Sequence, residues 1–385
     1  MTEKLYYADS HIWEFTARVT ACSQGKKGFL VELDRTAFFP EGGGQPADTG
    51  FIGEAAVWDV HERDGRILHH THTALEPGTE YECRLDREQR LRRMQNHSGE
   101  HVVSGLVHAM YGFENVGFHM GEDCMTIDFS GELDEEQLAE VEKRANETVR
   151  ANLPVNCFFP EGEELERLEY RSKLELTENV RIVEIGGVDR CACCAPHVAR
   201  TGEIGMIKLI EHSRHRGGVR VTLVCGMDAL DYANQLQSGV FAVSRLLSAK
   251  RHETAKAVER LLAEQAKNKE RSDRLGMELA ALKAAAFGET HGNICVFDQV
   301  LDEVALRELV NLLSEKCGGF AAAFSGNDQE GYRYIIGSRT KNLRELSKEI
   351  NQGIGGKGGG SPEMLQGRAT KTAQDIKSFI SDMDV

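Results

Sequence analysis

Two pairs of potential metal ligands stand out in this 385-residue sequence. His97 and His101 lie four residues apart in a proline-free segment whose apolar residues recur at helical spacing, so both imidazoles share one face of a predicted helix of about 25 residues. Cys193 and His197 repeat the four-residue spacing in a second segment. Because zinc prefers thiolate and imidazole and takes four ligands in structural sites, the two pairs predict one Zn2+ site.

Each pair also has a simpler interpretation when it is taken alone. The histidine pair can be an ordinary solvated or core pair, and Ser98 in place of glutamate rules out the His-Glu-x-x-His helix of a metalloprotease. The second segment can be a surface loop with incidental cysteines, and Cys191 or Cys194 can replace Cys193 as the ligand. The coincidence of two identical spacings favours the metal site.

A run of three glycines marks the N-terminal part of the chain. Gly42, Gly43 and Gly44 permit a tight backbone that a ligand can approach closely, although a plain glycine-rich hairpin has the same composition. Residues 1–90 otherwise consist of short predicted strands separated by turns, which indicates a small antiparallel β-barrel. Histidines 69, 70 and 72 fall on one of these strands, and we expect them on its surface.

Three motifs in this order resemble the editing domain of alanyl-tRNA synthetases and the free-standing alanyl-tRNA editing proteins. They are the segment 36–45, the histidine pair 97 and 101, and the Cys193 and His197 pair followed by Thr201–Gly205. The family's usual Cys-Gly-Gly-Thr-His differs here at positions 194 to 196, which read Cys-Ala-Pro.

The resemblance implies an aminoacyl-tRNA deacylase, a carboxylic ester hydrolase that removes serine or glycine from mischarged tRNA(Ala). It places Thr36 against the serine hydroxyl and Gln45 at the reacting ester, with the glycines 42 to 44 facing the aminoacyl group. Four protein ligands leave zinc no open position, so the ion would organise the pocket or bind ribose. Only about ten residues precede the barrel, so we expect the enzyme to act in trans.

The C-terminal part combines long helices with a compact α/β unit. Residues 232–290 carry apolar residues every three or four positions, which predicts helices that pair between subunits as a homodimer, present a basic face or pack within one chain. Residues 291–385 resemble the DHHA1-like domain shared by alanyl-tRNA synthetases and DHH phosphoesterases, through the run Gly353–Ser361. Lys357 in that predicted turn, and Arg216 in a turn that can equally be a solvated hairpin tip, are candidate substrate-binding residues.

These patterns predict an α+β multidomain protein. We expect a β-barrel over residues 1–90, a zinc-binding α/β editing core over 91–231, a helical linker over 232–290 and the C-terminal domain over 291–385. No apolar run has the length of a membrane helix, and the ten cysteines are scattered, which is typical of reduced thiols in the cytoplasm.

The net charge of −15 argues against a nucleic-acid partner, because Lys and Arg supply most non-specific affinity for phosphates. The excess of acid is confined to the first two thirds, since the chain from Gln235 onward holds 21 Lys/Arg against 20 Asp/Glu. Two rival functions therefore stay open. One is a non-catalytic tRNA-binding protein with structural zinc, and the other is a nucleotide phosphoesterase, which the absence of an Asp-His-His motif disfavours.

Overall fold

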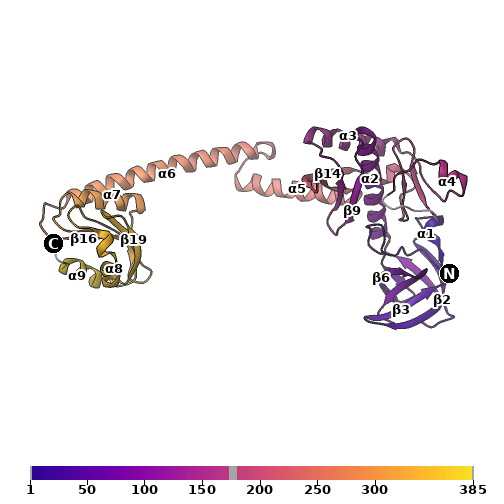
Figure 1. The fold of residues 1–385 in the computed structure, drawn as a ribbon, viewed down its shortest axis with the longest axis horizontal. Coiled ribbons are helices and arrows are strands. Elements are labelled where there is room, and N and C mark those ends of the chain that lie inside the picture. Colours follow the sequence, from indigo (N-terminus) through magenta and orange to yellow (C-terminus); the bar gives the residue numbers. More distant parts are fainter. Residues whose placement is uncertain (1, 173–179, 384–385) are drawn as a thin grey trace. The chain divides into compact units, whose positions relative to one another are not determined.

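The computed structural model describes residues 2–172 and 180–383. Its contacts group the chain into two compact units, residues 1–241 and 242–385, and each is described by itself (Figure 1). Helices and sheets occur in both units, which confirms the expected mixed α+β class. The boundary falls inside helix α5 (Gly226–Leu246), within the segment predicted to be helical.

A closed antiparallel barrel forms the N-terminal part of the first unit, as the strand pattern predicts. Strand β1 (Glu3–Lys4), followed by α1 (Leu5–Ala8), pairs in parallel with β4 (Arg35–Thr36) beside it. The six barrel strands, in spatial order, are β2 (Glu14–Gly25), β3 (Gly28–Leu33), β7 (Arg66–Thr71), β6 (Ala55–Arg63), β5 (Gly50–Ile52) and β8 (Glu80–Leu85).

The expectation that all the strand histidines lie on the surface is wrong for His69. Its side chain points into the barrel and is fully buried, whereas His72 is exposed. The His69 Nδ1–H donates to the Val31 carbonyl at 2.9 Å, so Nε2 carries the lone pair and accepts from the Thr36 hydroxyl at 2.8 Å. Burial of these polar atoms is tolerated because both ring nitrogens have partners.

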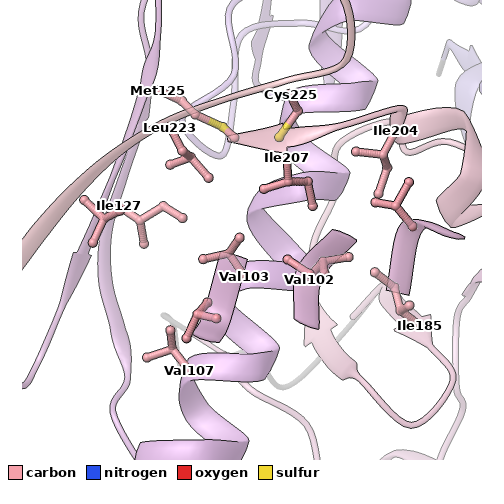
Figure 2. Close-up of a cluster of buried hydrophobic side chains, with 14 of the residues drawn as sticks. Val102, Val103, Val107, Met125, Ile127, Ile185, Ile204, Ile207, Leu223 and Cys225 are labelled. Carbon is pink, nitrogen blue, oxygen red and sulfur yellow. The ribbon is translucent and has the colours of Figure 1, made fainter. Parts of the chain in front are cut away.

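The long helix α2 (Arg87–Tyr111) follows the barrel in the first unit and matches the predicted length of 25 residues. Asp86 caps its N-terminus by accepting from the Gln89 amide, and Gly112 ends it at φ 70°. Figure 2 shows Val102, Val103 and Val107 of this helix in the main hydrophobic cluster of the unit. One face of α2 is therefore fixed by packing, which leaves the histidine face rigidly placed.

Two sheets surround α2. The four-stranded sheet has the order β14 (Ile207–His215), β15 (Gly218–Cys225), β10 (Met125–Phe129) and β9 (Asn115–Met120). The three-stranded sheet has the order β11 (Val155–Phe158), β12 (Ile182–Ile185) and β13 (Asp189–Ala192). Helix α3 (Glu135–Ala151) lies between β10 and β11 in sequence, with a capping box at Asp134 and a left-handed Asn152 at its end. The short α4 (Glu163–Arg167) and η1 (Thr201–Ile204) complete this part.

The second unit begins in α5 and continues through η2 (Arg251–Glu253) and the 32-residue helix α6 (Thr254–Ala285). Its sheet has the order β16 (Ile294–Asp298), β17 (Ala321–Asn327), β18 (Gly331–Gly337), β20 (Met364–Ala369) and β19 (Gly356–Gly360). Only β16 and β17 pair in parallel in this sheet. Its remaining helices are α7 (Glu303–Ser314), α8 (Leu343–Ile354) and α9 (Ala373–Asp382).

The glycine run expected to be a turn is instead an edge strand for most of its length. Residues Gly356–Gly360 form β19, in which Lys357 lies opposite Arg368 of β20. A Cβ atom on Gly358 would lie 2.2 Å from the Gln366 carbonyl oxygen, so glycine permits a close approach of the two strands. Within the described residues, no helix combines the length and apolar content needed to cross a bilayer.

Candidate metal centre

The structure brings the four predicted ligands to one place. The ligand atoms of His97, His101, Cys193 and His197 all lie within 4.8 Å of one another. The Cys193 Sγ is 3.5 Å from Nε2 of His97 and 3.4 Å from Nε2 of His197. Each of the three imidazoles is only 2% exposed. Helix α2 and the segment after β13 therefore meet at a buried cluster of three nitrogens and one sulfur.

The Nδ1 atoms of the two helix histidines, His97 and His101, each have a hydrogen-bond acceptor. His97 Nδ1–H donates to Gln45 Oε1 at 2.8 Å, and His101 Nδ1–H donates to Asp189 Oδ2 at 2.9 Å. Zinc-binding histidines ordinarily have such a partner, which fixes the tautomer and leaves the other nitrogen free to coordinate. Both Nε2 atoms are thus prepared to bind a metal ion.

His197 is held in the same way by the helix that carries the other two histidines. Its Nδ1 lies 3.0 Å from the Ser98 hydroxyl, which also accepts from the Val198 amide at 3.2 Å. Ser98 therefore ties the second ligand segment to α2. The residues present fit a zinc ion, because four borderline-soft donors converge and all three imidazoles are pre-oriented.

An ion pair fixes the carboxylate behind His101. Arg171 donates to both oxygens of Asp189, at 2.8 and 2.9 Å. Burial by itself would raise the pKa of Asp189, but the hydrogen bonds and charges of His101 and Arg171 bring it below its usual range. Asp189 therefore stays ionised and holds the His101 ring.

Among the neighbouring cysteines, geometry and charge favour Cys193 as the thiolate ligand. Although burial opposes ionisation, the imidazoles of His97 and His197 bring the pKa of Cys193 well below its usual value. Burial raises the pKa of Cys191 and of Cys194 to about 11. Cys191 also lies within ligand distance of His101 and Asp189, but that carboxylate is already engaged.

A cavity of about 500 Å³ opens beside this centre. Gly43 and Gly44 line it, whereas Gly42 does not, and the turn is closed by reciprocal backbone hydrogen bonds between Gly42 and Gln45 of 3.1 and 3.0 Å. Gly44 has φ 82°, and a Cβ there would lie 2.7 Å from the Phe118 ring. The other side chains lining the cavity that matter for its chemistry are Tyr7, Glu100, Asn115, Arg171 and Arg181.

The two predicted catalytic residues, Gln45 and Thr36, are buried and do not line the cavity. Gln45 is fully buried and reaches the centre through His97, and its Nε2 has no partner among the described residues. Thr36 is also fully buried, and its hydroxyl accepts from the Phe38 amide at 3.1 Å while it donates to His69. Neither residue is among those that line the cavity.

The two predicted phosphate-binding residues lie elsewhere. Arg216 is exposed at the tip of the β14–β15 hairpin, with φ 46°, and is not among the residues lining the cavity. Lys357 belongs to the second unit, where it is exposed and lines a shallow hollow with Asn351 and Gly355.

Two acidic residues of the site were missed by sequence reasoning. Glu100 lines the cavity, is 4% exposed and accepts through Oε1 from Ser104 and Asn115. Its position three residues after His97 puts it on the same face of a helix, which is a signal that the sequence contains. Asp189 was also missed as a functional residue, because its contact with His101 depends on the tertiary fold.

Two family models match the chain. Residues 180–221 match the threonyl and alanyl tRNA synthetase second additional domain, which contains Cys193 and His197. Residues 291–384 match the DHHA1 domain. The chain is therefore a protein that joins these two domains, which is the class that the zinc motif and the C-terminal glycine run indicate.

Two relatives match the chain over nearly their whole length. The chain is 28% identical to alanyl-tRNA editing protein AlaX-L of Pyrococcus horikoshii, across 98% of this chain and 96% of that protein. It is 25% identical to alanyl-tRNA editing protein Aarsd1 of Rattus norvegicus, across 97% and 96%. The chain is thus similar over nearly its whole length to two proteins named alanyl-tRNA editing proteins, and it contains matches to both family models.

The same region occurs inside longer proteins. The chain is 33% identical to alanine–tRNA ligase of Halobacterium salinarum over 87% of this chain but only 38% of that protein. It spans about two fifths of the length of the alanine–tRNA ligases that it matches.

Proposed function

We propose that the protein is an aminoacyl-tRNA deacylase that hydrolyses mischarged tRNA(Ala) in trans. The substrate is the ester between serine or glycine and the terminal adenosine. The observation that carries the proposal is the convergence of His97, His101, Cys193 and His197 beside a 500 Å³ cavity, in a chain whose full-length relatives are named alanyl-tRNA editing proteins.

A zinc ion held by these four residues would supply a fixed positive charge at the cavity wall, where an ester oxygen gains negative charge during hydrolysis. With four protein ligands it has no open position of the kind that a water-activating zinc keeps. The chain's own contribution is positioning. Gln45 orients His97, and the tight turn at Gly43 and Gly44 lets the substrate approach the backbone.

The test is deacylation of seryl-, glycyl- and alanyl-tRNA(Ala) by the purified protein. We expect release of serine or glycine and sparing of alanine. His97→Ala should lose bound zinc and activity together, whereas His108→Ala, an exposed histidine on the same helix, should keep both. Retention of zinc or of activity by His97→Ala would contradict the proposed site.

The same assay separates the two rivals. A non-catalytic tRNA-binding protein would hold zinc and bind tRNA but release no amino acid. A phosphoesterase would hydrolyse small nucleotides, but among the described residues every candidate metal group lies in the first unit, and none is in the DHHA1 unit. This distribution favours the deacylase over the phosphoesterase.

We also propose that α6 pairs with a second copy of the chain as a homodimer. Leu261, Leu275 and Leu282 occupy one heptad position on this helix and are exposed by 52%, 52% and 71%. A row of exposed leucines along one side of a helix is typical of a surface that packs against a second helix. Light scattering should give twice the chain mass, and Leu261→Lys with Leu275→Lys should give a monomer. A monomeric wild-type protein would refute the pairing.

A further inference from the structure

A buried carboxylate with one uncommitted oxygen stands beside the candidate metal centre. Glu100 Oε1 accepts from the Ser104 hydroxyl at 2.6 Å and from the Asn115 amide, and these two donors fix the side chain. Oε2 lies 3.7 Å from His101 Nε2, which is too long for a hydrogen bond. This second oxygen is therefore available to a ligand in the cavity that Glu100 lines.

The other charged residues of the cavity have partners of their own, although the Arg181 Nε has none among the described residues. Arg171 pairs with Asp189, and Arg181 donates to the carbonyls of Cys193 and Ala195 at 3.0 and 2.8 Å. Glu114 is exposed and pairs with His108 at 3.0 Å.

Glu100 is only 4% exposed, and hydrogen bonds reach only one of its two carboxylate oxygens. Such a group is costly to bury and is expected to receive a cation or a further donor.

We infer that Glu100 binds the α-ammonium group of the aminoacyl ester and restricts the site to esters with a free amino group. The inference rests on the proposed function. The ammonium nitrogen is separated from the ester carbonyl by one carbon atom, so an ester placed beside His101 brings its ammonium to the carboxylate. An acylated nitrogen is neutral and bulkier, and would leave Glu100 unpaired. The site would thereby reject N-acylated and peptidyl esters while accepting the seryl and glycyl esters with a free amino group.

The experiment compares seryl-tRNA(Ala) with N-acetylseryl-tRNA(Ala) as substrates of the zinc-loaded full-length protein. We expect the wild-type protein to prefer the free amino group strongly. Glu100→Gln keeps the shape of the side chain but removes its charge, and should lower kcat/KM for seryl-tRNA by about ten- to a hundredfold with little change for the acetylated ester. Glu100→Asp, which keeps the charge, should retain part of the preference. Glu136→Gln, which changes an exposed carboxylate of α3 outside the cavity lining, should retain all of it.

Zinc content and thermal unfolding, measured on every variant, separate the outcomes. The inference is supported if Glu100→Gln loses the preference for seryl-tRNA(Ala) over N-acetylseryl-tRNA(Ala) while its zinc content is unchanged. Equal loss on both substrates, loss of zinc in Glu100→Gln, or an unchanged preference in both Glu100 variants overturns it and leaves the deacylase proposal standing. Turnover of neither ester by the wild-type protein removes the proposed function, and this inference with it.

Discussion

Thr36 joins the segment before the glycine turn to the barrel core through two hydrogen bonds. Its hydroxyl accepts from Phe38 and donates to His69, so Thr36→Val removes both and leaves the His69 Nε2 buried without a donor. We expect a loss of about 1–3 kcal/mol in the free energy of unfolding. Because Thr36 lies outside the cavity lining, the preference for serine over alanine should not change. A lost preference in a stable Thr36→Val protein would restore the substrate contact that the family resemblance implies.

His69 predicts a pH dependence of stability. Burial lowers its pKa to about 4 in the folded protein, against about 6.5 in the unfolded chain. Between these values the unfolded chain binds the extra proton, so stability is full above about pH 6.5 and falls as the pH is lowered toward about 4, by about 3 kcal/mol in total.

Urea denaturation across this pH range tests the prediction. His69→Gln should have a flatter dependence than the wild-type protein, although it is less stable at neutral pH. His72→Gln changes an exposed histidine of the same segment and should follow the wild-type slope. Parallel curves for wild type and His69→Gln would show that His69 is not buried in its neutral form.

At the scale of elements, the turn after β4 depends on one glycine. Gly44→Ala would force a side chain into the left-handed region at φ 82° and against Phe118. Gly65→Ala has a similar φ of 71° and no atom within 4 Å of the added Cβ, so it isolates the backbone cost. We expect Gly44→Ala to be less stable than Gly65→Ala by about 1–3 kcal/mol and to impair deacylation. Equal stability and activity would mean that Phe118 yields without disturbing the cavity.

The elements that the sequence predicts well are those whose ends are encoded locally. Helix α3 begins after Asp134 and ends before Asn152, as its capping residues indicate. The convergence of the four candidate metal ligands was predicted because their spacing is itself the signal. The hydrogen-bond partners of the histidine Nδ1 atoms, such as Asp189, lie on other elements of the fold. No local sequence pattern predicts that these elements contact each other. The strand β19 was missed because its glycines serve close strand pairing, whereas local rules associate them with turns.

At the scale of the whole molecule, the charge distribution bears on tRNA binding. The protein carries a net charge of −15, but the chain from Gln235 onward is nearly neutral and includes the exposed Lys357. If this part contacts the phosphate backbone, Lys357→Gln should weaken tRNA binding at all salt concentrations and reduce the slope of log affinity against log salt by about 1. Zinc content should stay unchanged. Lys27→Gln, in the exposed β2–β3 hairpin, is the matched control and should leave both affinity and slope as they are.

The order of the four ligands along the chain has a consequence for biogenesis. During translation His97 and His101 leave the ribosome well before Cys193 and His197, and a nascent chain with the first pair alone offers an ion only two of its four donors. Stable capture must therefore wait until the segment after β13, which carries Cys193 and His197, has been synthesised and has docked on α2. If these residues bind zinc as proposed, chains made in zinc-starved cells should fail to hold the two segments together and should be degraded faster than the metal-bound protein.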